Sequence, residues 1–296
     1  MTKSNILEQY LACVKSRVIV IPAYTIPTLV QLFIVSNLRP NLFDVVKVFV
    51  SVIMVAYSIY WVNDLVDLQD DLKNKELGNP GPANRPIGSN LVSNNIYKFF
   101  IATNAIVGLL IGLTINFNIF IIQFLFFILG ILYSVEPIRL KKRPFLKNVT
   151  IAIGAVLITS SGAFVYRYIT PLNIYYAFMN FLVAFTTPSM LDLRDFKGDM
   201  AMGLKTLPVV LGPIFTARMT IGVSLAIILS TFIGYIGIGF NVALPILVTI
   251  VMSAWFYVSY PLLKNWQDPV IVDKIAMKRI VPLMLIFYLI PLVDLL

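Results

Sequence analysis

Residues 44–71 read DVVKVFVSVIMVAYSIYWVNDLVDLQDD. Residues 44–62 form an apolar run, and about 20 helical residues are needed to cross the hydrocarbon core of a bilayer. The run is followed at once by four aspartates, which are Asp64, Asp67, Asp70 and Asp71. We therefore expect a membrane-spanning helix that ends in an acidic segment at the membrane boundary.

The rest of the chain has the same apolar character. Of its 296 residues, 59% are hydrophobic and 12% are charged, whereas soluble domains average about 25% charged residues. A soluble helical bundle would need polar outer faces, which these apolar runs lack. The predicted fold class is an all-α integral membrane protein, and residues 1–296 form a single domain because no linker divides them. Nine transmembrane helices are predicted, at residues 18–36, 44–62, 96–115, 117–134, 149–166, 172–190, 213–236, 239–262 and 280–296.

The charged residues predict the topology. The chain has no histidine, which excludes histidine-based catalysis and histidine-ligated zinc or haem. Its net charge of +9 is better explained by membrane topology than by binding to nucleic acid, because 20 of the 23 Lys and Arg residues fall on one side of the predicted helices. That side comprises the N-terminal segment and the loops near 63–98, 135–147, 191–218 and 263–279. By the positive-inside rule we expect it to be cytoplasmic, in the cell membrane of a prokaryote.

The acidic residues are concentrated at two places. Of the 14 Asp and Glu residues, seven lie in two short stretches. The first acidic segment contains the four aspartates of residues 64–71, and the second contains Asp192, Asp195 and Asp199. They follow the second and sixth apolar runs, so both are expected on the cytoplasmic face. Their separation by four helices suggests two pseudo-repeated four-helix halves plus one helix, with each half contributing one segment to a shared site.

Carboxylates at these spacings are expected to bind a divalent cation. On a helix, Asn63, Asp67 and Asp71 would stack on one face with Asp64 nearby, and the three aspartates of the second segment would also share a face. Like charges that close repel each other, and Mg²⁺ relieves the conflict because it binds carboxylate oxygens together with substrate phosphates. An ordinary solvated helix end could explain one segment, but it explains two on the same face less well.

Basic residues near these segments could bind a diphosphate. Arg85, Lys141 and Lys205 are candidates, with Arg able to bind phosphate oxygens in a bidentate manner. Arg17 is a weaker candidate, because a cation at a helix start can simply snorkel to the interface. The same reasoning assigns Lys142, Arg143 and Lys147 to topology and contact with anionic lipid.

Four segments of the sequence form a recognisable set. They are Asn63-Asp64-x-x-Asp67-x-x-x-Asp71, Asn84-Arg85-Pro86-Ile87, Tyr133-Ser134-x-x-Pro137-x-Arg139-Leu140-Lys141, and Asp192-x-x-Asp195-x-x-x-Gly198-Asp199-x-x-x-Gly203-x-Lys205-Thr206-Leu207-Pro208. In these segments the chain resembles the UbiA superfamily of intramembrane prenyltransferases, and the order of the segments along the chain makes the match specific. The sequence departs from relatives at residues 73–83, which look like an insertion before Arg85, and at Lys197, where relatives often have an acid.

The resemblance implies nine helices around a central cavity and Mg²⁺-dependent transfer of a prenyl group from its diphosphate to a hydrophobic or aromatic acceptor. It implies that Asn63 and the basic candidates bind the diphosphate. The implied metal ligands are Asp64, Asp67, Asp71, Asp192, Asp195 and Asp199. Of the aromatic residues near the cytoplasmic helix ends, Tyr133 is favoured to face the allylic cation, Tyr57 is a further candidate, and Trp61 is interpreted as part of an interfacial belt.

The sequence leaves two alternative functions open. A terpene cyclase of the same superfamily would use the same aspartates without a separate acceptor. A cation-coupled transporter would instead spread acids through the membrane depth, and the helix interiors here contain almost none. Besides the bilayer, the partners expected are a prenyl diphosphate and an aromatic or lipid-type acceptor, with no nucleic acid and no obligatory protein partner.

Overall fold

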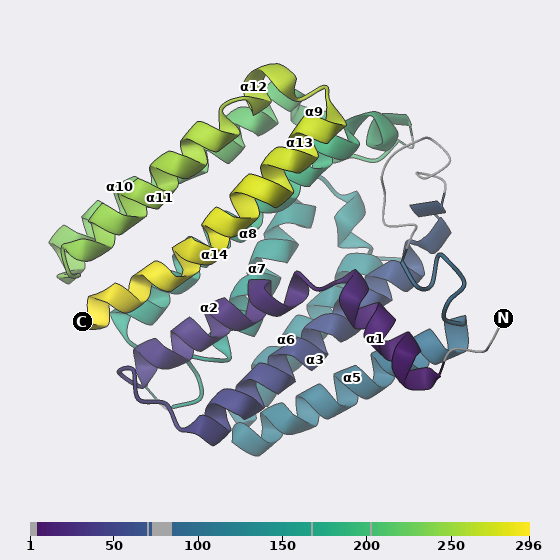
Figure 1. Ribbon diagram of the computed structural model, residues 1–296, viewed down its shortest axis with the longest axis horizontal. Helices are drawn as coiled ribbons and strands as arrows, with labels where there is room; N and C mark the ends of the chain where they lie inside the picture. The colour runs from purple at the N-terminus through teal and green to yellow at the C-terminus, as the bar shows by residue number, and fades with distance from the viewer. Residues whose placement is uncertain (1–4, 70, 73–84, 167, 202) are drawn as a thin grey trace.

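The computed structural model describes residues 5–69, 71–72, 85–166, 168–201 and 203–296 (Figure 1). Within these ranges the regular structure is entirely helical. Short turns of 3₁₀- or π-helix are η2 Leu140–Lys142, η3 Ala276–Ile280 and η4 Ile290–Leu295. The α-helices are α1 Ile6–Ser16, α2 Val20–Val35, α3 Leu42–Val66, α5 Asn94–Ile115, α6 Phe117–Ser134, α7 Leu146–Ser160, α8 Pro171–Ala201, α9 Leu207–Leu211, α10 Pro213–Ile238, α11 Ala243–Ser259, α12 Leu262–Asn265, α13 Pro269–Ile275 and α14 Val281–Leu289.

Each predicted apolar run coincides with a helix. In the described part of the chain, seven helical stretches are long and apolar enough to cross a membrane, and α1 with α2 forms a further candidate that is bent by 71°. The remaining run corresponds to α7, a shorter apolar helix. The chain is therefore an all-α, multi-pass membrane protein, as its sequence predicts.

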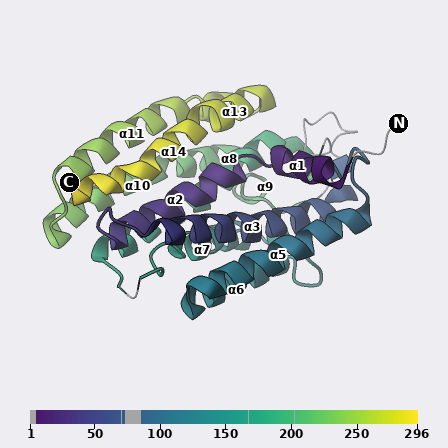
Figure 2. The same cartoon turned by 60° about the horizontal axis from the view of Figure 1, so that its bottom comes forward.

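Successive helices pack against one another around the bundle. The order of contacts is α2, α3, α5, α6, α7, α8, α10, α11 and α14, and α14 returns to contact α2. Figures 1 and 2 show α10, α11 and α14 along one side and α3, α5 and α6 along the other, with α2, α7 and α8 between them. The buried apolar side chains form two clusters that match these sides, and α2 contributes to both.

Helix α1 is an element that the apolar runs did not predict. Asn5 caps it by accepting a hydrogen bond from the backbone N–H of Leu7 at 2.8 Å, and Glu8 accepts from the backbone N–H of Asn5 at 3.0 Å. This reciprocal pair is a capping box, which is a recognisable start signal in sequence. The bend after α1 places Arg17 between the two helices, where it can reach the end of α3.

One close approach fixes α2 against the turn that follows α7. A Cβ atom built on Gly162 would lie 1.8 Å from the backbone oxygen of Thr28. We expect Gly162→Ala to push the backbones apart and to destabilise the protein by about 1–3 kcal/mol or more, as measured by thermal unfolding in detergent. Gly222→Ala on α10 is the matched control, because its added methyl group meets nothing within 4 Å. Equal melting temperatures for the two variants would contradict this packing.

Candidate active site

The first acidic segment continues the backbone course of α3. The helix ends at Val66, and Asp67 is its C-terminal cap. The N–H of Asp67 donates to the carbonyl of Asn63 at 2.9 Å, and the N–H of Asp71 donates to the carbonyl of Asp67 at 2.8 Å. Backbone hydrogen bonds four residues apart therefore connect Asn63, Asp67 and Asp71, at the spacing that the sequence predicts. Ser134, at the end of α6, donates a hydrogen bond to the side chain of Asn63 at 3.2 Å.

Asp64 is the buried centre of this segment. Its carboxylate is inaccessible to solvent and forms ion pairs with the guanidinium groups of Arg17 and Arg85. Arg17 Nε donates to Asp64 Oδ2 at 3.2 Å, and the hydroxyl of Tyr97 donates to the same oxygen at 3.2 Å. Arg17 also lies 5.1 Å from the centroid of the Tyr60 ring, a cation–π distance. Two guanidinium groups and one hydroxyl group thus contact the fully buried carboxylate of Asp64.

Arg85 reaches the site despite the preceding insertion. The insertion itself, residues 73–83, lies outside the described residues, but Arg85 contacts Asp64 and lies 3.5 Å from Asp71 Oδ2. Burial and the neighbouring Arg17 lower the pKa of Arg85 to about 10, which leaves it protonated at neutral pH. The structure therefore places both Arg17 and Arg85 beside the first acidic segment.

Asp67 is held by the loop that follows α6. Arg139 NH2 lies 3.1 Å from Asp67 Oδ1, and the ammonium group of Lys141 pairs with the same oxygen. Burial, followed by the nearby charges of Lys147 and Lys142, lowers the pKa of Lys141 to about 7. The carboxylate of Asp64 opposes this shift, because its negative charge favours the protonated ammonium and raises the pKa. Lys141 therefore lies beside the first acidic segment, as its sequence position predicts.

The second acidic segment lies within a single long helix. Helix α8 continues to Ala201, so Asp192, Asp195 and Asp199 all project from its last turns. Asp192 is buried and forms an ion pair with Lys147, which is the second residue of α7. The next residue, Asn148, fixes α7 against α8 by donating to Ser189 Oγ and to the carbonyl of Phe185, both at 2.7 Å.

Lys147 was wrongly assigned to topology and lipid contact. Its ammonium group is largely buried against Asp192, because α7 begins one residue before it and packs along α8. Three more residues that contact the aspartates were not among the predicted site residues: Tyr97, Arg139 and Arg194. The sequence does give a signal for Lys147, which stands two residues before the predicted apolar run at residues 149–166. No such signal marks Tyr97.

Asp195 is held by its own neighbour. Arg194 donates to both oxygens of Asp195, from Nε at 2.8 Å and from NH2 at 2.9 Å. The remaining nitrogen, NH1, donates to Asp273 on α13 at 2.9 Å. This arrangement uses the bidentate geometry of Arg to connect the second acidic segment to the last membrane-crossing stretch.

One loop connects the two acidic segments. Lys141 pairs with Asp67, and six residues later Lys147 pairs with Asp192. Tyr133, at the end of α6, is close enough to interact electrostatically with Lys147, Asp192, Tyr60 and Arg17. The residues around the two segments therefore lie at one end of the bundle, as the common-face prediction requires.

Some predicted residues lie elsewhere. Lys205 is exposed and forms no ion pair with any acid in the part of the chain that the structure describes. Trp61 does not belong to an interfacial belt, because it is fully buried and packs against Tyr10 with ring centroids 5.6 Å apart. Tyr57 is buried as well, and its hydroxyl donates to the carbonyl of Val14 at 3.3 Å. Both rings are therefore packed inside the protein.

The donor set is chemically suited to Mg²⁺. All the candidate ligands are carboxylates, the oxygen donors that hard cations prefer. Asp192 Oδ2 is buried without a hydrogen-bond partner among the described residues, and an unsatisfied buried carboxylate oxygen is costly unless a cation or donor approaches it. Across those same residues, no three acids converge closely enough to form a metal-binding group. Within the described ranges, five of the six aspartates instead pair with Arg or Lys side chains, namely Asp64, Asp67, Asp71, Asp192 and Asp195.

Fold and site together define a multi-pass membrane protein with acids and bases gathered at one end. The model of the UbiA prenyltransferase family matches residues 24–277. A digeranylgeranylglyceryl phosphate synthase of Thermococcus sibiricus is 30% identical over 207 residues, which cover 69% of this chain and 68% of that protein. The bacteriochlorophyll synthase 34 kDa chain of Chloroflexus aurantiacus is 26% identical, covering 70% of this chain and 64% of that protein.

Solved structures share the fold. A structure of digeranylgeranylglyceryl phosphate synthase superimposes with a TM-score of 0.73 at 22% identity, covering 98% of both chains. A UbiA homologue from Archaeoglobus fulgidus bound to GPP and Mg²⁺ gives a TM-score of 0.71 at 18% identity, covering 90% of this chain and 96% of that one. The chain belongs to the UbiA prenyltransferase family, and it is accordingly an enzyme of the prenyltransferase class.

Proposed function

We propose that this protein transfers a prenyl group from a prenyl diphosphate to a lipid-type acceptor within the membrane, with Mg²⁺ held by the two acidic segments. The observation that supports this most directly is a pair of contacts. Lys141, in the loop after α6, contacts Asp67, and Lys147, at the start of α7, contacts Asp192. These contacts bring acids from two distant helices beside basic residues, which is the charge pattern that a metal–diphosphate unit needs.

The carboxylates proposed to hold the metal are Asp64, Asp67, Asp71, Asp192, Asp195 and Asp199. Bound Mg²⁺ would stabilise the negative charge that develops on the diphosphate as its bond to carbon breaks. Arg17, Arg85 and Lys141 each contact one of these carboxylates, so their N–H donors lie beside any diphosphate held there. Lys147 is added to this set by its contact with Asp192, while Asn63 and Lys205 remain proposals from the sequence pattern.

The apolar bundle would protect the reactive intermediate. An allylic cation is captured by water unless water is excluded, and helices buried in a bilayer provide that exclusion. Tyr133 is proposed to face this cation from the last turn of α6, where it interacts electrostatically with both Arg17 and Asp192. A central cavity among the helices would admit the isoprenoid chain.

The membrane topology is also a proposal. Lys147 at the start of α7 contacts the C-terminal part of α8, whereas α8 begins at Pro171, at the other end of this 31-residue helix. The chain must therefore cross the bundle between those residues, which supports α7 as the ninth membrane span. The positive-inside rule then places the N-terminus and the site at the cytoplasmic face of the cell membrane.

The acceptor is proposed from the relatives' names. Digeranylgeranylglyceryl phosphate carries two geranylgeranyl groups, so its synthases' names support a prenylated glycerol phosphate as acceptor for this chain. The bacteriochlorophyll synthase relative supports a tetrapyrrole acceptor as the second candidate. Incubation of the purified protein with Mg²⁺, several prenyl diphosphates and each acceptor, followed by mass spectrometry, should reveal a glycerol phosphate that carries one more prenyl group than the acceptor supplied. A terpene hydrocarbon or alcohol formed without any acceptor would instead identify a cyclase.

The contact between Arg194 and Asp273 predicts a positioning effect. We expect Asp273→Asn to loosen Arg194 and thereby Asp195, raising the Mg²⁺ concentration for half-maximal activity about tenfold. Asp273 is half-exposed, so stability should change by less than about 1 kcal/mol. Asp273→Glu should retain the wild-type Mg²⁺ requirement, because it keeps a carboxylate. An unchanged requirement in Asp273→Asn would rule out the positioning role.

A further inference from the structure

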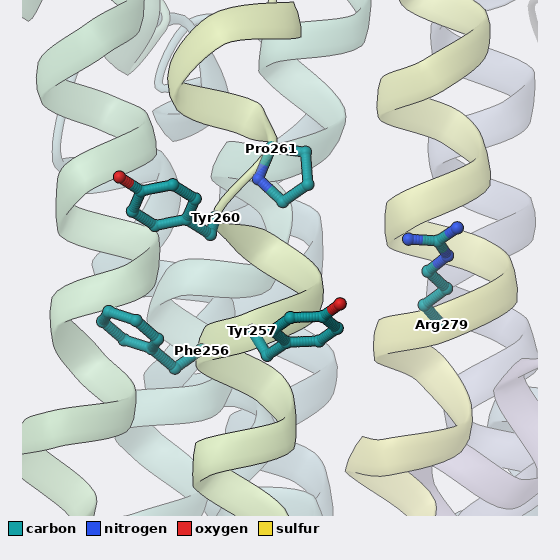
Figure 3. Close-up of a pocket in the computed structure, with 5 residues that line it drawn as sticks. All are labelled: Phe256, Tyr257, Tyr260, Pro261 and Arg279. Atoms are coloured by element: carbon teal, nitrogen blue, oxygen red, sulfur yellow. The ribbon is translucent and has the colours of Figure 1, made fainter.

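A shallow pocket of about 390 Å³ lies on the outside of the bundle, and none of the site aspartates lines it. It is lined by Phe256, Tyr257, Tyr260, Pro261 and Arg279 (Figure 3). The first four belong to the C-terminal end of α11 and the turn after it, and Arg279 belongs to the π-helical turn η3. In Figure 3 the Tyr257 ring and the Arg279 guanidinium face each other across the gap between these two elements.

The side chains that line this pocket are exposed although they are large. Tyr257 is 78% exposed and Tyr260 is 52% exposed. Tyr residues at the end of a membrane-crossing helix typically lie at the level of the lipid head groups. The pocket is therefore expected at the boundary between the hydrocarbon and the head groups.

The cations beside the pocket are exposed and have no acidic partner among the described residues. In the π-helical turn, Ala276 and Ile280 are buried while Met277, Lys278 and Arg279 are exposed. Neither Lys278 nor Arg279 forms an ion pair with an acid in the ranges that the structure covers. The two acids of α13 and its cap are already engaged. Asp273 pairs with Arg194, and Asp268 accepts hydrogen bonds from the backbone N–H groups of Val270 and Ile271.

Two exposed apolar stripes lead away from this basic group in the same direction. On α11, positions spaced three and four residues apart continue one helix face from Tyr257, namely Ser253, Ile250 and Ile246. On the antiparallel stretch that includes α14, the face of Arg279 continues through Pro282, Ile286 and Leu289. Because α11 contacts both η3 and α14, the two stripes run along neighbouring helices.

We propose that this face of α11 and η3–α14 binds one anionic phospholipid of the surrounding bilayer. The phosphate accepts hydrogen bonds from Arg279 and from the hydroxyl of Tyr257, and one acyl chain follows the apolar stripes. Arg is suited to this contact because its planar guanidinium matches the geometry of phosphate oxygens. A lipid phosphate also removes the cost of a lipid-facing guanidinium that has no protein partner.

The test measures lipid retention on the intact purified protein by native mass spectrometry. The protein is equilibrated in detergent with equal amounts of dioleoylphosphatidylglycerol and dioleoylphosphatidylcholine, and we expect wild type to retain one phosphatidylglycerol in preference to phosphatidylcholine. Arg279→Gln should lower that retention about tenfold, and Tyr257→Leu should lower it as well. Lys98→Gln, which removes an exposed cation of α5, is the matched control and should leave retention unchanged.

Three outcomes would overturn the proposal. One is equal retention of the two lipids by wild type, which would show that the net negative charge of the head group plays no part. Another is unchanged phosphatidylglycerol retention in Arg279→Gln. The third is displacement of the lipid by inorganic phosphate at the same concentration, which would identify a site for small anions rather than for a bilayer lipid.

Discussion

Asp64→Ala is expected to give the largest loss of stability of any single substitution at this site. The carboxylate of Asp64 is completely buried and compensates both Arg17 and Arg85. Its removal would take the counter-charge from Arg17 and would leave Arg85, among the described residues, with only the more distant carboxylate of Asp71, 3.5 Å away. Breaking a buried ion pair in this way costs about 3–5 kcal/mol. The free energy or midpoint of unfolding in detergent measures the loss, and prenyl transfer should be lost with it.

Two variants control for this result. Asp44→Ala removes an acid from the first turn of the same helix, where Asp44 has no ion pair among the described residues and favours the helix N-terminus, so it should cost less than about 1 kcal/mol. Asp64→Asn keeps the size and an acceptor oxygen but removes the charge, so we expect an intermediate loss. If Asp64→Ala melts like Asp44→Ala, the buried charge cluster does not stabilise the bundle.

Lys147→Met is expected to have the second largest effect. The substitution keeps a long apolar side chain but leaves the buried carboxylate of Asp192 without its base, at a cost of about 3–5 kcal/mol. Prenyl transfer should fall at least about 100-fold, because the variant lacks a buried cation that we propose contacts the diphosphate. Initial rates and thermal unfolding of the same preparation measure the two effects.

Lys142→Met is the matched control in the same loop. Lys142 pairs with Glu136 on the surface, and exposed pairs of this kind contribute about 0–1 kcal/mol. Lys147→Arg, which keeps the charge, should retain part of the activity. Equal, small effects of Lys147→Met and Lys142→Met would restore the interpretation that both lysines only set topology.

The fold was largely predictable because membrane-crossing helices need long apolar runs, and every predicted run coincides with a helix. The boundaries were less predictable. Helix α8 extends well beyond the apolar run that ends at residue 190, because Asp192 and Asp199 are buried against other elements rather than released to solvent. Helix α1 is amphipathic, so an apolar run does not mark it, although its capping box does.

The candidate site was predictable in its acids and less so in its bases. Asp64, Asp67 and Asp192 stand out because charges are rare in this chain and they follow apolar runs. The partner of each acid is set by helix packing over long separations in sequence, such as the 33 residues between Asp64 and Tyr97. Lys147 and Lys205 both stand shortly before an apolar segment of the sequence. Of these two lysines, Lys147 alone contacts an aspartate among the described residues.

The central claim is that both acidic segments act together on one prenyl diphosphate. It is tested by measuring diphosphate release from geranylgeranyl diphosphate, with Mg²⁺ or with EDTA, for wild type, Asp67→Ala, Asp195→Ala and the surface control Glu136→Ala. We expect release by wild type and Glu136→Ala only with Mg²⁺, and a loss of at least about 100-fold in each aspartate variant. Wild-type rates in both aspartate variants, or undiminished release in EDTA, would contradict the account.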